Sequence, residues 1–234
     1  MRPTLLLSAA LALSLCGPAY GQSPSTSPAA DTAEDTEIFA GEIAQFKAAD
    51  RRHPPRPGGV VFVGSSSIRL WERLDSAFPG VNVVQRGFGG SELHDVVYRA
   101  PRIVLPYRPR LVVLYAGDND LAAGKSPDQV LKEYESFVSL VLRTLPETRI
   151  AFISIKPSPA RWELIDNIRA TNALVENRVK TDPRLIYVDV FTPMLGADGF
   201  PRNELFDEDK LHLNAKGYAL WRNLLRPVVR ETTR

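Results

Sequence analysis

The feature that most constrains the fold is an alternation, from Val60 onward, of short apolar runs with segments of helical periodicity. Apolar runs with the length and content of buried β-strands occur at residues 60–63, 81–85, 111–115, 150–155 and 185–188. Helical patterns lie between or after them, at residues 68–78, 91–98, 127–145, 162–180 and 215–229. Continuous apolar strands alternating with helices are typical of a parallel sheet covered on both faces. The chain is therefore expected to adopt an α/β fold, a flavodoxin-like three-layer α/β/α sandwich with five parallel strands.

Length and charge support one domain and exclude one class of partner. The chain has 234 residues, of which 44% are hydrophobic, which is enough for one sizeable core. Its 29 basic and 27 acidic side chains are interleaved and give a net charge of only +2. Because no basic stripe is present, nucleic acid is not expected as a partner.

The first 21 residues have the pattern of a signal peptide. Arg2 supplies a positive charge, residues 5–15 are apolar, and Ala19-Tyr20-Gly21 is a small-x-small cleavage site. We expect cleavage after Gly21 and export to the periplasm or the medium, with no integral membrane segment left. The alternative is a lipoprotein anchored through Cys16, the only cysteine, although Leu15 before it is bulkier than such signals usually allow.

Residues 22–36 are rich in Ser, Pro, Ala, Thr and Asp and are expected to form a disordered linker. The domain is expected to occupy residues 37–234 and to begin with a short amphipathic helix at 37–49. Since ligands of open parallel sheets bind beyond the carboxyl ends of the strands, the segments to examine are 64–67, 86–91, 116–124, 156–161 and 191–213.

The segment Gly64-Ser65-Ser66-Ser67 follows the first strand and has two interpretations. A serine there can simply cap the next helix, with the glycine making the turn. Alternatively, a serine held at a helix N-terminus is a nucleophile, because the helix dipole and free N–H groups stabilise negative charge as it forms. The glycine-rich residues 85–91, after the second strand, are a flexible turn or a place where backbone approaches a ligand.

After the third strand, residues 116–120 contain two carboxylates and Asn119. The spacing does not fit a calcium loop, so a polar turn is the simple interpretation. The alternative is that Asn119 donates its side-chain N–H to a reacting oxyanion.

Of the three histidines, His212 is the best candidate for a general base. Asp209 lies three residues before it, a spacing that lets a carboxylate reach one imidazole nitrogen and leave the other free. His94, at the start of a helix after the second strand, is the rival, and His53 lies in a basic, proline-flanked surface segment.

Side chains after the fourth strand are candidates for a pocket wall. Trp162 is expected either to stack on a sugar or, as the preferred interpretation, to pack in the core; Lys156 and Arg161 are candidates for binding an anion. Arg69 and Trp71 have the same ambiguity, and the spacing of Trp71 from neighbouring apolar residues favours the core.

Taken together, these segments resemble the SGNH subgroup of the GDSL esterase/lipase family over residues 60–229. The four residues that name the subgroup correspond here to Ser66, Gly90, Asn119 and His212, and Asp209 completes a D-x-x-H block. Each motif is short, but all four occur in the family's order and at the expected ends of strands or before the last helix.

The chain departs from the family pattern at two positions. Ser65 stands where the family usually has the aspartate of G-D-S, which leaves Ser67 as a register-shifted alternative nucleophile. Gln85 stands where many relatives have asparagine. Neither departure removes a residue of the inferred chemistry.

The resemblance implies a serine esterase that acts on a small-molecule or glycan ester, either a short-chain or acetyl ester, or a lysophospholipid. Ser66 would be the nucleophile, His212 the base and Asp209 its partner, with an oxyanion hole formed by Ser66, Gly90 and Asn119. No metal or organic cofactor is required. The alternatives are an O-acyltransferase with the same site, an inactive ligand-binding module, and a phosphate binder that uses the glycine-serine turn, which leaves Asp209 and His212 unexplained. The sequence does not indicate an oligomeric state.

Overall fold

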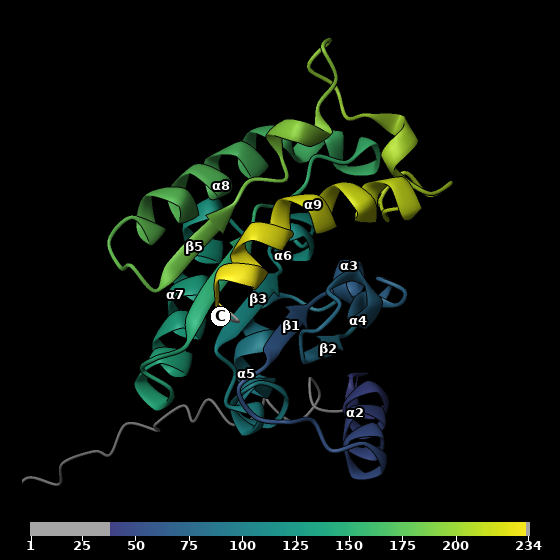
Figure 1. Cartoon of the computed structure of the whole chain (residues 1–234). Coiled ribbons are helices and arrows are strands. Elements are labelled where there is room, and N and C mark those ends of the chain that lie inside the picture. The colour runs from purple at the N-terminus through teal and green to yellow at the C-terminus, as the bar shows by residue number, and fades with distance from the viewer. Residues whose placement is uncertain (1–37, 233–234) are drawn as a thin grey trace, which may run out of the picture.

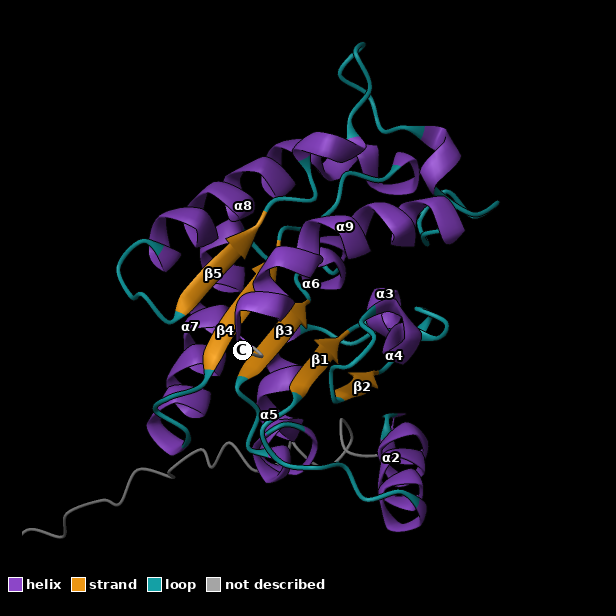
Figure 2. Ribbon diagram, in the orientation of Figure 1, coloured by secondary structure: helices purple, strands orange, loops and turns teal. Residues whose placement is uncertain are grey.

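The computed structural model describes residues 38–232, so the predicted signal peptide and linker lie outside the described range. A five-stranded sheet forms the centre of the molecule (Figure 2). Its strands are β1 Val60–Gly64, β2 Val83–Gly87, β3 Leu111–Tyr115, β4 Arg149–Ile153 and β5 Leu185–Val188. All neighbouring strands are parallel, in the order β2-β1-β3-β4-β5, which is the flavodoxin-type order. The predicted fold class is therefore confirmed.

Helices cover both faces of the sheet (Figure 1). The helices are α2 Ala40–Arg52, α3 Ser66–Arg69, α4 Leu74–Ala77, α5 Leu93–Ile103, α6 Asp118–Ala122, α7 Pro127–Thr144, α8 Ile165–Val179 and α9 Ala215–Thr232. Short 3₁₀ segments occur at η1 Leu105–Tyr107, η2 Pro159–Leu164, η3 Thr192–Met194 and η4 Asn203–Leu205. One core cluster joins α2, α5, α7 and α8 to the sheet, and the other joins α3, α4 and α9 to its opposite face.

The central strands β1 and β3 are apolar throughout because each supplies both cores. Along β1, Val61 and Val63 belong to the first cluster, whereas Val60 and Phe62 belong to the second. This division follows from the alternation of side chains across a strand. All five residues of β1 and of β3 are buried.

Gly64 ends β1 where only glycine fits. Its φ is +136°, and a Cβ atom there would lie 1.8 Å from the Tyr115 carbonyl oxygen on the neighbouring strand. The chain can thus turn sharply from the sheet into α3, so that the serines come directly after the strand.

The single helix predicted at 68–78 is wrong: the segment forms the short helices α3 and α4, with a break at Arg73, whose φ is +51°. The physical reason is a side chain from β2. The Gln85 amide donates to the carbonyl oxygens of Ile68 at 2.6 Å and Trp71 at 3.1 Å, which satisfies acceptors that a longer helix would need.

Two strands are displaced from their predicted bounds. The β2 strand begins at Val83 because the Val81 N–H already donates to the Phe78 carbonyl in the preceding turn. The β4 strand ends at Ile153, and beyond it the backbone of Ile155 exchanges two hydrogen bonds with the side chain of Asn172 on α8. A side chain thus replaces a neighbouring strand there.

The first described helix, α2, packs beside β2 at the edge of the sheet (Figure 1). It begins and ends three residues later than the predicted 37–49, and it contributes buried Ile43 to the core. Over residues 38–232, no helix combines the length and apolar character that a membrane crossing needs.

Candidate active site

The sequence-predicted residues come from four segments that meet at the carboxyl edge of the sheet. Ser66 is the first residue of α3, directly after β1, and Gly90 lies in the loop after β2. Asn119 is the second residue of α6, after β3, and His212 lies in the loop before α9. Because the strands are parallel, their carboxyl ends lie at one edge, so residues far apart along the chain can meet.

Three of these side chains form one hydrogen-bonded chain. Ser66 Oγ lies 2.9 Å from His212 Nε2, across 146 positions of sequence, and His212 Nδ1 lies 2.5 Å from Asp209 Oδ2. The arrangement fits a hydroxyl nucleophile, a base and a carboxylate that orients the base.

The loop that carries His212 is held by hydrogen bonds within the loop itself, from a carboxylate to the backbone and across one antiparallel bridge. Asp209 Oδ1 accepts the N–H groups of Leu211 and His212, both at 2.9 Å. The ends of the loop meet in the antiparallel bridge between Phe206 and Leu213. A three-residue spacing therefore suffices for one carboxylate to hold both the backbone and the ring of the histidine.

The Asp209 carboxylate is ionised over the whole neutral range. Partial burial raises its pKa, but the N–H groups of His212 and Leu211 and the His212 ring outweigh this effect and lower the pKa to about 2. An ionised carboxylate only accepts hydrogen bonds, so His212 Nδ1 carries the proton. Nε2 of the neutral ring is then the acceptor that faces Ser66.

The two neighbouring serines are buried, and their backbone groups make other contacts. Ser67, the alternative nucleophile, is 1% exposed, and its carbonyl oxygen accepts the Tyr218 hydroxyl at 3.0 Å. Ser65 is also buried; its N–H donates to the Tyr115 carbonyl, and its own carbonyl accepts the N–H groups of Ile68 and Arg69. Of the three serines, Ser66 is the one whose hydroxyl lies beside the imidazole.

The amide of Asn119 has a defined orientation. Its Nδ2 donates to the Ser91 carbonyl at 2.9 Å, and its Oδ1 accepts from Arg161 Nη2 at 3.0 Å. A primary amide nitrogen has two hydrogens, so one remains for a further acceptor. Because Ser91 directly follows Gly90, this contact brings the Asn119 amide beside the loop that contains Gly90. Gly90 itself has a φ of +79°.

A buried ion-pair network, absent from the sequence-based site, holds Arg161. Asp118 lies 2.6 Å from Arg161 Nη1 and 2.5 Å from Lys156 Nζ, and Lys156 also donates to the Tyr115 hydroxyl at 3.0 Å. Burial raises the pKa of the Asp118 carboxyl, but the Lys156 and Arg161 charges outweigh burial and lower it. No pattern marks this network in the sequence, although Asp118 is adjacent to Asn119.

The end of β2 and the start of the glycine loop pack directly against the turn from β1 into α3. A Cβ atom on Gly87 would lie 2.2 Å from the Arg69 backbone nitrogen, and the Phe88 N–H donates to the Gly64 carbonyl at 2.9 Å. The segment that carries Gly90 therefore runs alongside the turn that carries Ser66.

The other two histidines lie elsewhere. His94 Nδ1 is 3.3 Å from Lys125 Nζ, within a charged cluster in which Lys125 pairs with Glu92, Asp120 and Glu133. His53 is the exposed C-cap of α2. The structure thus brings His212, and not His94, to Ser66.

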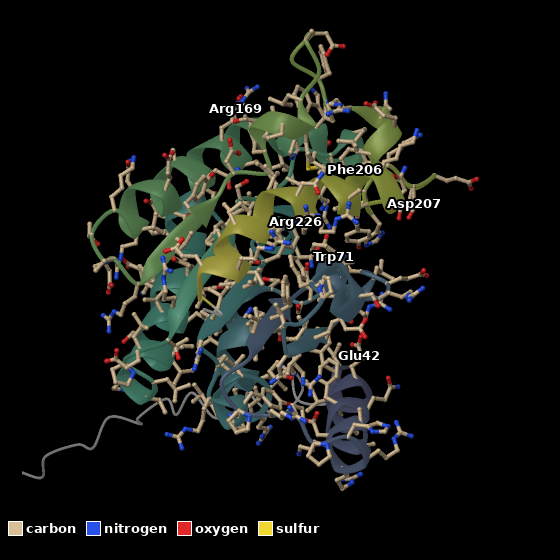
Figure 3. All side chains as sticks on the ribbon, viewed as in Figure 1. Glu42, Trp71, Arg169, Phe206, Asp207 and Arg226 are labelled. Atoms are coloured by element: carbon tan, nitrogen blue, oxygen red, sulfur yellow. The ribbon has the colours of Figure 1, made fainter. Side chains whose placement is uncertain are left out.

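The expectations for the fourth strand end need correction. Lys156 is 1% exposed and paired with Asp118, so it is no anion-binding side chain at the surface. Trp162 does not pack in the core: it is partly exposed, and its ring lies 5.0 Å from that of Phe200, which is 53% exposed. Trp71 does pack in the core, between α3–α4 and α9 (Figure 3).

Within residues 38–232, no three histidine, cysteine, aspartate or glutamate side chains are grouped so as to hold a metal ion. The two carboxylates that flank Asn119 are neutralised by cations instead. Asp120 is buried and accepts both the Leu93 N–H and the Lys125 ammonium.

Comparison with protein families gives one match over most of the described chain. The model of the GDSL-like lipase/acylhydrolase family matches residues 59–220. No match to a curated protein is found.

Solved structures of the same fold are numerous, and three of them show the degree of similarity. A candidate acylhydrolase from Bacteroides fragilis is 22% identical, covering 85% of this chain and 97% of its own, with a TM-score of 0.70. A GDSL-like lipase from Bacteroides thetaiotaomicron is 23% identical, covering 83% and 97%, with a TM-score of 0.67. A carbohydrate esterase of family 3 from Talaromyces cellulolyticus is 19% identical, covering 75% and 98%, with a TM-score of 0.59.

Proposed function

Because the chain belongs to the GDSL-like lipase/acylhydrolase family, and is therefore an ester hydrolase, we propose that Ser66, His212 and Asp209 are its catalytic triad. The observation that carries the proposal is the continuous chain of hydrogen bonds from the Ser66 hydroxyl through the imidazole to the carboxylate. A phosphate binder or an inactive ligand-binding module does not need such a chain.

In the proposed reaction, Ser66 Oγ attacks the ester carbonyl carbon while His212 Nε2 takes the hydroxyl proton. Asp209 stabilises the imidazolium that forms. The C–O bond to the leaving alcohol then breaks, and the imidazolium returns its proton to that alcohol. Water attacks the acyl-enzyme with His212 again as base, which releases the acid and restores the serine.

The tetrahedral oxyanion would be stabilised by the N–H groups of Ser66 and Gly90 and by the Asn119 amide. The loss of one such donor typically lowers kcat by about 10²–10³-fold. The contact from Asn119 to Ser91 supports this assignment, because it brings the amide beside the loop that contains Gly90.

For the substrate, we propose a short acyl or acetyl ester, with a carbohydrate as the alcohol. The partly exposed rings of Trp162 and Phe200 support a sugar, because aromatic faces suit the apolar faces of sugar rings. Trp162 directly follows Arg161, which bonds Asn119, and the Ala160 N–H donates to the Lys210 carbonyl next to Asp209, so the segment that carries Trp162 borders the site. One structural neighbour is named as a carbohydrate esterase.

We also propose that the protein is exported after cleavage at Gly21. The N-terminal sequence of the mature protein tests this.

The test is hydrolysis of p-nitrophenyl acetate and butyrate, with acetylated xylan as the carbohydrate substrate. We expect Ser66→Ala and His212→Ala to abolish turnover, and Ser67→Ala and His94→Ala, as matched controls, to retain it. Activity in Ser66→Ala together with its loss in Ser67→Ala would refute the assigned nucleophile. Product analysis with an acceptor sugar separates hydrolysis from acyl transfer.

A further inference from the structure

The helix α2 lies outside the segment that matches the family model, yet it packs against the oxyanion side of the site. The match begins at residue 59, whereas α2 spans Ala40–Arg52. The aromatic and charged side chains of this region meet the end of β2, the glycine loop after it and α3. The region makes three sets of contacts with these elements, one at the far end of the helix and two nearer the site.

The far end of α2 is anchored on the last residues of β2. The Arg86 guanidinium, whose side chain is 8% exposed, pairs with Asp50, and the Tyr107 hydroxyl donates to the other Asp50 oxygen at 2.5 Å. The same guanidinium lies over the Phe46 ring at 5.0 Å. Arg86 directly precedes Gly87, so this anchor fixes the point where the glycine loop begins.

Phe39, the residue just before α2, packs against the middle of the loop. The Phe39 ring meets the Phe88 ring edge to face, with centroids 5.0 Å apart, and both side chains are buried. Phe88 is the one large side chain among Gly87, Gly89 and Gly90. It thus gives the loop its apolar attachment to the core, and Phe39 covers that attachment.

Glu42, in the first turn of α2, makes the third set of contacts; the three sets together are called the α2 clamp below. Glu42 Oε1 accepts the Gly89 N–H at 3.1 Å and lies 3.6 Å from the Nε of Arg69 on α3. Figure 3 shows Glu42 at the end of α2 that faces α3 and α4. One carboxylate thus joins the residue before Gly90 to the helix whose first residue is Ser66.

The α2 clamp is needed because the loop is rich in glycine. Glycine has more conformational freedom than any other residue, so Gly87, Gly89 and Gly90 have little intrinsic preference for one backbone geometry. An oxyanion hole lowers the barrier only when its donors are already oriented before the charge develops. Orientation that the loop sequence does not supply must come from neighbouring elements.

We propose that α2 positions the oxyanion loop and that Glu42 is a positioning residue for the Gly90 N–H. The inference rests on the proposed function, since it assigns Gly90 to the oxyanion hole. It adds to the active site a helix that lies outside the family match, acting through the Gly89 backbone and Arg69.

The test compares four variants of the full chain in hydrolysis of p-nitrophenyl acetate. We expect Glu42→Ala to lower kcat about tenfold, with KM changed less than about twofold, because orientation of a donor acts on the transition state. Glu42→Gln keeps an oxygen acceptor for Gly89 and should lose less than about threefold, whereas Glu42→Asp, which withdraws the carboxylate, should lose more. Lys47→Ala, at an exposed position on the same helix, is the control and should match wild type.

A second measurement uses phenylboronic acid, which forms a tetrahedral adduct with a reactive serine. Its affinity should weaken in Glu42→Ala by about the same factor as kcat. Wild-type kcat and wild-type boronate affinity in Glu42→Ala would overturn the inference, and so would an equal loss in Lys47→Ala. If Glu42→Ala does not fold, Glu42→Asp decides by the same two measurements. Failure of the proposed function is distinct, because wild type itself would then neither hydrolyse the ester nor bind the boronate.

Discussion

Two aspartates serve the same edge of the sheet from opposite environments. The Asp209 side chain is 49% exposed on a loop and bonds His212 directly. The Asp118 side chain is 5% exposed and is linked to the side chain of its neighbour Asn119 through Arg161. Both carboxyls have lowered pKa values, but Asp209 owes this to backbone N–H groups and an imidazole, and Asp118 to two cations that outweigh its burial.

Because the environments differ, removing each carboxylate should have a different consequence, for catalysis in one case and for stability in the other. Water can solvate the partners of an exposed carboxylate when it is removed, so loss of Asp209 should affect chemistry far more than folding. Removal of a buried carboxylate leaves buried cations without a counter-charge, which costs stability first. Four measurements can break or sharpen this contrast.

The largest effect is expected for Asp209→Asn, which should lower kcat about a thousandfold, because an amide at this position no longer fixes the tautomer of His212. The midpoint of urea unfolding at neutral pH should fall only slightly, because solvent screens the half-exposed carboxylate. Glu208→Gln, on the same exposed loop, is the matched control and should keep wild-type kcat. A large shift of the unfolding midpoint in Asp209→Asn would show that the exposed carboxylate is structural as well.

For Asp118→Asn, we expect a loss of about 3 kcal/mol in the free energy of unfolding, since Lys156 and Arg161 would face a neutral partner inside the protein. Urea denaturation measures it, and Asp166→Asn, at a surface pair 93% exposed on the aspartate side, is the control. Stability equal to wild type would mean that water or a rearranged side chain compensates the buried charges.

The third effect concerns the link between the buried network and Asn119. Arg161 uses one terminal nitrogen for Asp118 and the other for Asn119, and a lysine can reach only one of them. We expect Arg161→Lys to lower kcat about tenfold with a small change in stability. Esterase kinetics and urea unfolding on the same preparation test this, and an unchanged kcat would show that Asn119 needs no such support.

The contrast also explains which parts of the site the sequence predicts. The residues Ser66, Asn119 and His212 each follow a strand or precede a helix that hydrophobic periodicity already locates, so short motifs at strand ends suffice to find them. The Asp209–His212 contact is local, three residues apart, and could be inferred from spacing alone.

The network around Asp118 has no such signature. Lys156 lies in an irregular segment after β4 and Arg161 in the short η2. Whether each points inward or outward depends on contacts 38 to 42 residues away in sequence. Tertiary contacts also override local patterns elsewhere: the Gln85 amide takes up carbonyl groups at the end of α3, and the predicted single helix divides there. The role of Glu42 was likewise hidden, since its partner Gly89 is 47 residues distant.

The smallest effect is the acid dependence of stability, where both aspartates contribute with the same sign. A carboxyl whose pKa is lower in the folded state stabilises the fold at pH values above its unfolded pKa of 3.8, and that stability is lost as the pH falls through the folded pKa. For Asp209 the window runs from about pH 4 to about pH 2. Unfolding free energies measured between pH 5 and pH 2 should therefore fall less steeply in either asparagine variant than in wild type. Asp118→Asn should flatten the curve more, because solvent screens the half-exposed Asp209. The reverse order would mean that the exposed carboxylate, rather than the buried one, contributes more to the stability of this edge of the sheet.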